Sequence, residues 1–234
     1  MASTSLFTGT IAPLPKSGRP TGMFKLPLRA PLHLGVDGFE GDQQADHRVH
    51  GGPEKAVHLY PAAHYTRLAE KFPEVAGQLL PGSLGENISS MTLDETQVRI
   101  GDIFQLGGAR LQLCQPRSPC WKIDERFGVD GMAAFIADQR LTGWYFRVVQ
   151  PGMVAPESTL DLVQPAADAL TLAAAMALWQ AHRPALETLR QLAATPDIAS
   201  NWQRKIRERL AWLEKQPGSS APPAAAFHVK PETP

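Results

Sequence analysis

Short runs of hydrophobic residues, separated by glycine and proline, make up the chain as far as about residue 165. The sequence contains 19 glycines and 21 prolines, about 17% of all residues against a usual ~12%. This pattern predicts many short strands joined by turns. The clearest signal is a hairpin over residues 103–113, in which Gly107-Gly108 separates two alternating runs. Further strands are predicted at 5–12, 21–28, 57–60, 98–100, 144–149 and 159–163.

Helical spacing of apolar residues interrupts this strand-rich part twice, at 61–72 and at 131–139. From residue 167 to residue 216 turn residues become rare and helix formers dominate, which predicts three helices in this segment. Its Met and Trp residues are interpreted as the core of a small bundle. The apolar residues that share helix faces there are Leu172, Met176, Trp179, Trp202, Ile206, Leu210 and Leu213.

This change of pattern divides the chain into three parts. Residues 1–165 are predicted to form a β-rich domain, and residues 166–216 a three-helix C-terminal domain. Residues 217–234 are rich in proline and poor in large apolar residues, so we expect a disordered tail. The predicted fold class is therefore mainly β with α.

Charge is balanced, with 23 Lys and Arg against 23 Asp and Glu. A general nucleic-acid binder or a polybasic membrane protein is therefore not expected. The balance hides an uneven distribution, because residues 1–36 contain no acid and four basic residues: Lys16, Arg19, Lys25 and Arg29. A basic group on the last predicted helix is interpreted as a solvated face: Arg204, Lys205, Arg207 and Arg209.

Cysteine is rare, since the chain contains only Cys114 and Cys120. Two cysteines cannot build a disulfide framework, a four-thiolate zinc site or an all-cysteine iron–sulfur site. The start of the sequence has no secretory pattern, and the longest apolar run, 169–179, is about half a bilayer span. We therefore expect a protein of the reducing cytoplasm that does not enter a membrane.

Cys120 is the better candidate for thiol chemistry. Ser118-Pro119 is a typical helix start, which would place Cys120 in the first turn, where backbone N–H groups and the helix dipole favour a thiolate. Arg117 and Lys122 flank Cys120, and their positive charges also favour the thiolate. A buried structural cysteine is the alternative, and it is the preferred interpretation for Cys114, on a predicted strand.

A second group of chemically active residues occupies the glycine-rich loop 41–57, GDQQADHRVHGGPEKAV. An isolated pair such as His47 and His50 is a weak zinc signal without a clear third ligand. The Gly51-Gly52 backbone followed by Lys55 could hold an anion instead, although the spacing is not that of a Walker loop. The titratable residues of the loop include Asp42, Asp46, His47, His50 and Lys55, and the short element 84–88 adds Glu86 and Asn87 after a turn.

These residues leave two classes of enzyme open. One is an oxidoreductase whose soft metal is bound by a cysteine. The other is a cysteine hydrolase or transferase in which His50 is the base and Asp42 or Asp46 orients it.

Five motifs, in order, resemble the MOSC domain, the molybdenum-cofactor-sulfurase C-terminal domain: GDQQADHRVHGGPEKAV, LGENI, GDIFQLG, QPRSPCWK and GWYFRVVQPG. The YiiM branch, the bacterial hydroxylaminopurine-resistance proteins, is the most similar. The motifs lie within residues 37–152, and the helical segment after residue 166 also matches this branch.

The resemblance implies a β-barrel that binds molybdenum cofactor, with Cys120 as the protein ligand of molybdenum. Pyridoxal phosphate binding is a further property that the resemblance implies as possible. The implied activity is two-electron reduction of N-hydroxylated compounds, including hydroxylaminopurine and related bases. No G-x-G-x-x-G fingerprint for a flavin or nicotinamide is present, so a separate reductase would supply the electrons.

The resemblance also suggests roles for individual residues. A general acid must supply protons, and the candidates are Asp42, Asp46 and His50, with His50 favoured because histidine titrates near neutrality. Residues expected to contact the cofactor are Lys55, Arg117, Lys122, Gly51, Gly52, Glu86 and Asn87. The alternative is a sulfur or cofactor carrier that bears a persulfide on Cys120 and has no reductase activity.

Overall fold

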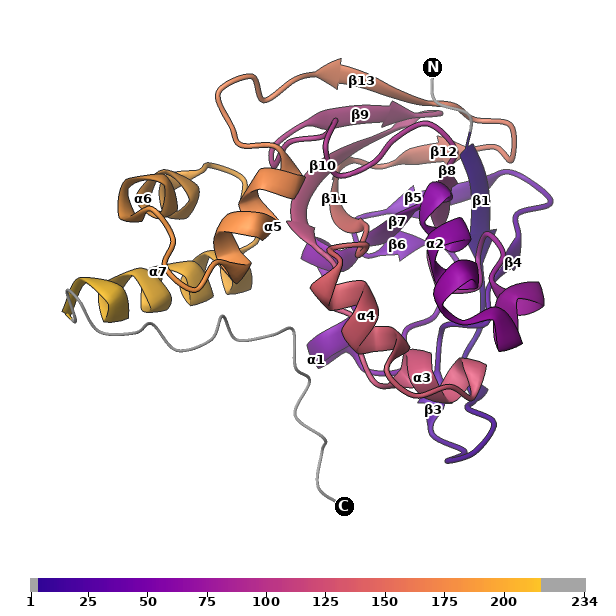
Figure 1. Ribbon diagram of the computed structural model, residues 1–234. Coiled ribbons are helices and arrows are strands. Elements are labelled where there is room, and N and C mark those ends of the chain that lie inside the picture. The colour runs from indigo at the N-terminus through magenta and orange to yellow at the C-terminus, as the bar shows by residue number, and fades with distance from the viewer. Residues whose placement is uncertain (1–3, 216–234) are drawn as a thin grey trace.

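The computed structural model describes residues 4–215 (Figure 1). Its main feature is an eight-stranded mixed sheet that curves into a half-barrel, in which only β7 and β8 run parallel. In spatial order these strands are β13 (Leu160–Gln164), β9 (Ile103–Leu106), β10 (Ala109–Pro116), β11 (Trp144–Gln150), β7 (Val57–Pro61), β8 (Ile88–Ser90), β1 (Thr4–Thr8) and β4 (Leu26–Pro27). Two small sheets consist of β12 (Gly152–Val154), β5 (Leu32–Gly35) and β6 (Gly38–Phe39), and of β2 (Ala12–Pro13) and β3 (Pro20–Thr21).

Seven α-helices belong to the described part of the chain. They are α1 (His47–His50), α2 (Ala63–Lys71), α3 (Lys122–Phe127), α4 (Met132–Asp138), α5 (Leu172–Gln180), α6 (Leu186–Ala194) and α7 (Ser200–Lys215), with short 3-10 helices at Pro53–Lys55 and Pro73–Gln78. The helices predicted at 61–72 and 131–139, and the three after residue 166, are confirmed. Within residues 4–215, no helix has both the length and the apolar character that a membrane span requires.

The predicted hairpin is also confirmed. Leu106 pairs with Ala109, so Gly107 and Gly108 form a two-residue turn, and Gly107 has a φ of 56°. The strands predicted at 57–60, 144–149 and 159–163 correspond to β7, β11 and β13. Local alternation and turn residues were sufficient to predict these elements.

Three strand predictions need correction. The segments 5–12 and 21–28 are not continuous strands, because β1 ends at Thr8 and an irregular segment separates β3 from β4. Residues 98–100 do not form a strand, because Arg99 makes an isolated bridge to Thr171 and a turn follows, in which the Asp102 side chain accepts the Arg99 N–H at 2.7 Å. Val98 and Ile100 are buried on either side of this bridge, and the side-chain bond takes an N–H that a longer ladder would use.

The sheet and the C-terminal helices share one hydrophobic core. Leu113 and Trp144 of the sheet belong to the same buried cluster as Met176, Trp202 and Ile206 of the helices. At residue 166 the secondary structure therefore changes from strands to helices, as predicted, but the same hydrophobic core extends over both parts. The predicted tail at 217–234 lies outside the described residues.

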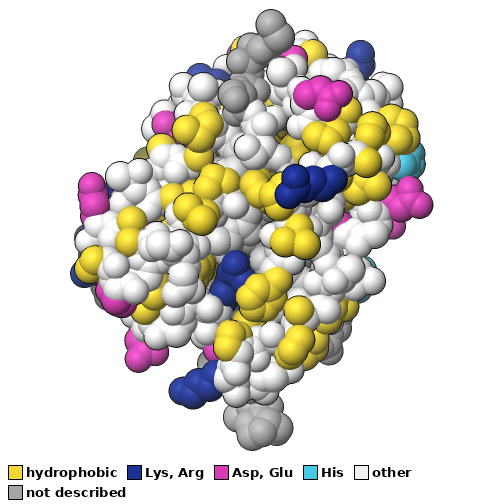
Figure 2. Space-filling view, turned by 90° about the vertical axis from the view of Figure 1, so that its right-hand side faces the viewer, with side chains coloured by type: hydrophobic (Ala, Val, Ile, Leu, Met, Phe, Trp, Pro, Cys, Tyr) yellow, Lys and Arg dark blue, Asp and Glu magenta, His cyan; other side chains and the backbone are white. Residues whose placement is uncertain are grey.

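A second buried cluster joins α2, α3 and α4 to the other end of the sheet, through Tyr60, Leu68, Ile123, Met132 and Ile136. The face shown in Figure 2 carries apolar side chains that are mostly separated by polar ones. Scattered exposed apolar residues of this kind are ordinary on a protein surface.

Candidate active site

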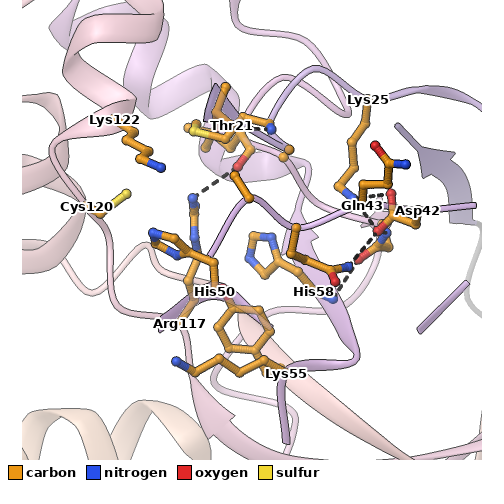
Figure 3. Close-up of a pocket in the computed structure, with 18 residues that line it drawn as sticks. Thr21, Lys25, Asp42, Gln43, His50, Lys55, His58, Arg117, Cys120 and Lys122 are labelled. Carbon is orange, nitrogen blue, oxygen red and sulfur yellow. Dashed lines mark hydrogen bonds and ion pairs between the residues drawn. The ribbon is translucent and has the colours of Figure 1, made fainter. Parts of the chain in front are cut away.

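One pocket brings together most of the residues that the sequence singled out (Figure 3). It contains about 590 Å³ of empty space, including its opening to solvent, which is within the range of small-molecule sites. Seven predicted residues line it: Asp42, His50, Lys55, Asn87, Arg117, Cys120 and Lys122. Segments far apart in sequence therefore form one site.

Four predicted residues do not line this pocket: Asp46, Gly51, Gly52 and Glu86. Glu86 is fully buried behind it and accepts hydrogen bonds from the Tyr65 hydroxyl and the Gly82 N–H, each at 2.6 Å. Burial raises the pKa of Glu86. Its role is to hold the turn at residues 82–86, so its expected contact with a ligand is not supported.

Cys120 lies in the pocket wall, 5% exposed, with its sulfur turned toward Lys122 and His50 (Figure 3). The prediction that it occupies the first turn of a helix is wrong, because α3 starts at Lys122. After β10 ends at Pro116, the Arg117 N–H still donates to Gly143 O at 3.1 Å, and the chain turns into the helix later than Ser118-Pro119 indicates. Cys120 contributes its carbonyl to this start, as acceptor for the Ile123 N–H at 3.0 Å.

Arg117 places a buried positive charge in the pocket. Its side chain reaches in from the end of β10, and Nη2 donates to Leu84 O at 3.1 Å. Nη1 is buried and has no hydrogen-bond partner among the described residues. An unsatisfied buried guanidinium N–H is costly, so this atom is suited to an oxygen of a bound anion.

Lys25 and Asp42 form a buried ion pair at the opposite side of the pocket (Figure 3). Lys25 Nζ lies 2.5 and 2.6 Å from the two carboxylate oxygens, which also accept from Gly9 N and Asn87 Nδ2. Asp42 is therefore fully engaged in holding the N-terminal segment against the loop at 84–87. This arrangement argues against Asp42 as the general acid and makes it an anchor.

The two histidines of the pocket are neutral near pH 7. Burial, followed by the charges of Lys122 and Arg117, lowers the pKa of His50 to about 4. Burial and Arg117 lower the pKa of His58 well below its ordinary value. The expectation that His50 titrates near neutrality is thus wrong, because the sequence showed neither that its ring is buried nor which cations surround it.

Three titratable residues of the pocket were not among the predicted site residues: Lys25, His58 and Tyr145. The rings of His58 and Tyr145 lie 5.2 Å apart, and His58 Nε2 is a second buried atom that lacks a partner among the described residues. A signal did exist for His58, a polar residue in the otherwise apolar run of β7. No feature of the sequence indicated that Lys25 pairs with Asp42.

The donor set fits an anionic group better than a bare metal ion. Within residues 4–215, no three His, Cys, Asp or Glu side chains are grouped as a metal site. The weak zinc signal has no support, because His47 is exposed and does not line the pocket. The pocket does combine one thiol with Arg117, Lys55 and Lys122, which suits a phosphate-bearing cofactor that supplies further metal ligands of its own.

Comparisons with known proteins identify the family to which this chain belongs. The MOSC domain family matches residues 46–161. Protein YiiM of Escherichia coli (strain K12) is 35% identical over 205 residues, which cover 87% of this chain and 90% of that protein. A protein named "Reductase" from Gibberella moniliformis is 30% identical over 145 residues, 62% of this chain and 26% of that protein. The crystal structure of YiiM from Escherichia coli superposes with a TM-score of 0.75 at 28% identity, covering 95% of this chain and 98% of that one. The chain belongs to the MOSC domain family and is a YiiM-like member of it.

Proposed function

We propose that this protein binds molybdenum cofactor in the pocket and reduces N-hydroxylated compounds, such as hydroxylaminopurine and other N-hydroxylated bases. The observation that carries the proposal is the buried Cys120 thiol in a pocket lined by Arg117, Lys55 and Lys122. Membership of the MOSC family and the name of the Gibberella relative support a reductase.

The donor set assigns separate tasks to these residues. Cys120 would bind the metal through its sulfur, and Arg117 Nη1 and the two lysines would bind the phosphate. When bound, the cofactor supplies a redox-active metal with sulfur ligands of its own. His58 Nε2 offers a further hydrogen-bonding atom at the pocket wall.

Reduction of a hydroxylamine to an amine breaks the N–O bond, consumes two electrons and two protons, and releases water. Neither His50 nor His58 carries the extra proton of an imidazolium near pH 7, because burial and nearby cations lower the pKa of both. Tyr145 keeps its hydroxyl proton, since burial raises its pKa. We therefore assign Tyr145 as a hydrogen-bond donor toward the substrate oxygen and the neutral His50 as a second hydrogen-bonding group, while the two protons that the reaction consumes come from solvent. A separate reductase would deliver the electrons.

Metal content and activity test the proposal together. Wild-type protein and Cys120→Ala are expressed in cells with and without cofactor biosynthesis, and molybdenum is measured by mass spectrometry. We expect molybdenum only in wild type from competent cells, and loss of hydroxylaminopurine reduction in Cys120→Ala. Cys114→Ala is the matched control, because this second thiol faces Glu54 O and Tyr145 O rather than the pocket.

Two results would overturn the proposal. Full molybdenum content and activity in Cys120→Ala would remove the thiol from the mechanism. A persulfide on Cys120 in wild type, without molybdenum and without reductase activity, would establish a sulfur carrier instead.

A further inference from the structure

A basic hairpin borders the pocket. Strands β2 and β3 are joined by a turn at residues 14–19, in which the side chains of Lys16 and Arg19 are exposed. Strand β3 ends at Thr21, which lines the pocket. The first 36 residues of the chain contain no acid, so no carboxylate of this segment offsets the two charges. The hairpin therefore presents positive charge to solvent beside the pocket.

The turn of this hairpin is held in one shape by its own backbone and by helix α3. The Leu14 N–H donates to Arg19 O at 2.9 Å. From α3, the carboxylate of Glu125 accepts the Lys16 N–H at 3.1 Å and the Ser17 N–H at 2.5 Å. A surface that is ordered before a partner arrives loses little conformational entropy when it binds.

Trp121 connects the hairpin to the thiol of the pocket. Its partly exposed ring lies below the Arg19 guanidinium, whose Cζ is 5.4 Å from the ring centroid. Lys122 Nζ is 6.0 Å from the same centroid and donates to Pro20 O of the hairpin at 2.9 Å. Trp121 follows Cys120 directly in the chain, so a protein that covers this ring lies one peptide unit from the thiol-bearing residue.

We propose that Lys16, Arg19 and Trp121 form a docking surface for an acidic electron-carrier protein, which supplies the electrons for the reaction in the pocket. The inference rests on the proposed function, because that reaction requires electrons from outside the chain. Tryptophan and arginine are the residue types that most often dominate binding energy at protein interfaces, and positive charge attracts an acidic partner. For each hydroxylamine reduced, two reduced one-electron carriers are oxidised, and the two protons come from solvent.

An electron carrier fits this surface better than a nucleic acid does. Electron transfer slows steeply with distance, and a protein docked on Trp121 lies beside Cys120. Nucleic-acid binders carry an extended basic surface on a basic domain. This chain has no net charge, and the hairpin surface combines three cations with the Glu125 carboxylate.

The test measures binding of flavodoxin, an acidic flavin-containing electron carrier, to the full chain by calorimetry. We expect Arg19→Glu to weaken binding about 30-fold and Trp121→Ala about 10-fold, as for central interface residues. Arg19→Lys keeps the charge and should stay within about 3-fold of wild type. Added salt should weaken the wild-type complex and reduce its advantage over Arg19→Glu.

Arg204→Glu is the matched control. It changes the net charge by the same amount at a side chain that is 60% exposed. Arg204 belongs to α7, which lies away from β3 and α3 (Figure 1). We therefore expect this variant to bind flavodoxin like the wild type.

Delivery of electrons is the second readout. Oxidation of reduced flavodoxin by molybdenum-loaded protein is followed by stopped flow in the presence of hydroxylaminopurine, and reduced methyl viologen replaces flavodoxin in a parallel assay. We expect Arg19→Glu to slow the oxidation of flavodoxin about 10-fold. The rate with viologen should not fall, because a small donor needs no docking surface.

Unchanged flavodoxin binding in Arg19→Glu, or an equal loss in Arg204→Glu, would overturn the inference, as would the absence of binding to wild type. Tighter binding of a short DNA duplex than of flavodoxin, lost in Arg19→Glu, would identify a nucleic acid as the partner and would also overturn it. Absence of molybdenum or of viologen-driven reduction in wild type would refute the proposed function. Calorimetry would still decide whether the hairpin surface binds an acidic carrier.

Discussion

The buried ion pair of Lys25 and Asp42 allows a quantitative test of how the pocket is held together. Their side chains are 5% and 1% exposed, so neither charge has access to water. Lys25→Met removes one partner and leaves the Asp42 carboxylate in a dry environment. Breaking such a pair from one side costs about 3–5 kcal/mol. Asp42 keeps hydrogen bonds from Gly9 N and Asn87 Nδ2, which offset part of the cost, so we expect about 3 kcal/mol.

The reverse variant should be milder. In Asp42→Asn the remaining Lys25 amine can release its proton, because burial already lowers its pKa, and we expect a loss of about 1–2 kcal/mol. The double variant removes both charges and should be less destabilised than the sum of the single variants, with a coupling energy of about 2 kcal/mol.

Urea unfolding of the cofactor-free protein, followed by circular dichroism, gives the free energy of unfolding of the wild type, the two single variants and the double variant. The matched control is the exposed pair Arg204–Glu208, with side chains 60% and 61% exposed, where Glu208→Gln should cost less than about 0.5 kcal/mol. A loss of unfolding free energy below about 1 kcal/mol for Lys25→Met, or a coupling energy near zero, would show that the pair is effectively solvated. Our account of the Lys25–Asp42 side of the pocket would then be wrong.

Three further predictions concern other parts of the molecule. Since the unfolded chain protonates His50 near 6.5 and the folded one only near 4, His50 alone should lower the stability of the cofactor-free protein by about 2 kcal/mol from about pH 7 to about pH 5. His50→Gln should remove this part of the slope in urea titrations, and an unchanged slope would contradict the assignment. Burial raises the pKa of Cys114 to about 12, so iodoacetamide should modify Cys114 only after unfolding, as peptide mass spectrometry would show. Gly143 has a φ of 63° and a Cβ there would lie 2.2 Å from Leu59 O, so Gly143→Ala should cost about 3 kcal/mol or more, whereas Gly77→Ala, in open space, should be nearly neutral in thermal unfolding.

Patterns of turn residues and of hydrophobic spacing predicted those helices and strands that are determined by residues close to one another in the sequence. The hairpin at Gly107-Gly108 and the three C-terminal helices follow from turn preference and helical periodicity, and the structure contains them. The strand predicted at residues 98–100 is reduced to one bridge between Arg99 and Thr171, because Asp102 closes a turn directly after it. Periodicity cannot tell such a single bridge from a short strand when a side-chain bond ends the pairing.

The sequence also identified seven of the residues that line the pocket, because Cys120, the loop at 41–57 and the basic residues beside Cys120 stand out by chemical type. It could not give their ionisation. His50 looked like a group that titrates near neutrality, and only the burial of its ring among Lys122, Arg117 and Lys55 lowers its pKa to about 4. Such shifts depend on distances between segments that lie far apart in the chain.

Residue types and local order thus determined which family of site this chain can build: a thiol, a glycine-rich loop and a set of cations in a mainly β protein with a helical C-terminus. Tertiary structure alone decided how these residues are arranged. It paired Lys25 with Asp42, moved Glu86 out of the pocket, left Arg117 Nη1 without a partner and connected Glu54 to α7. Burial and through-space charge set these properties, and neither is encoded in the spacing of residues along the chain.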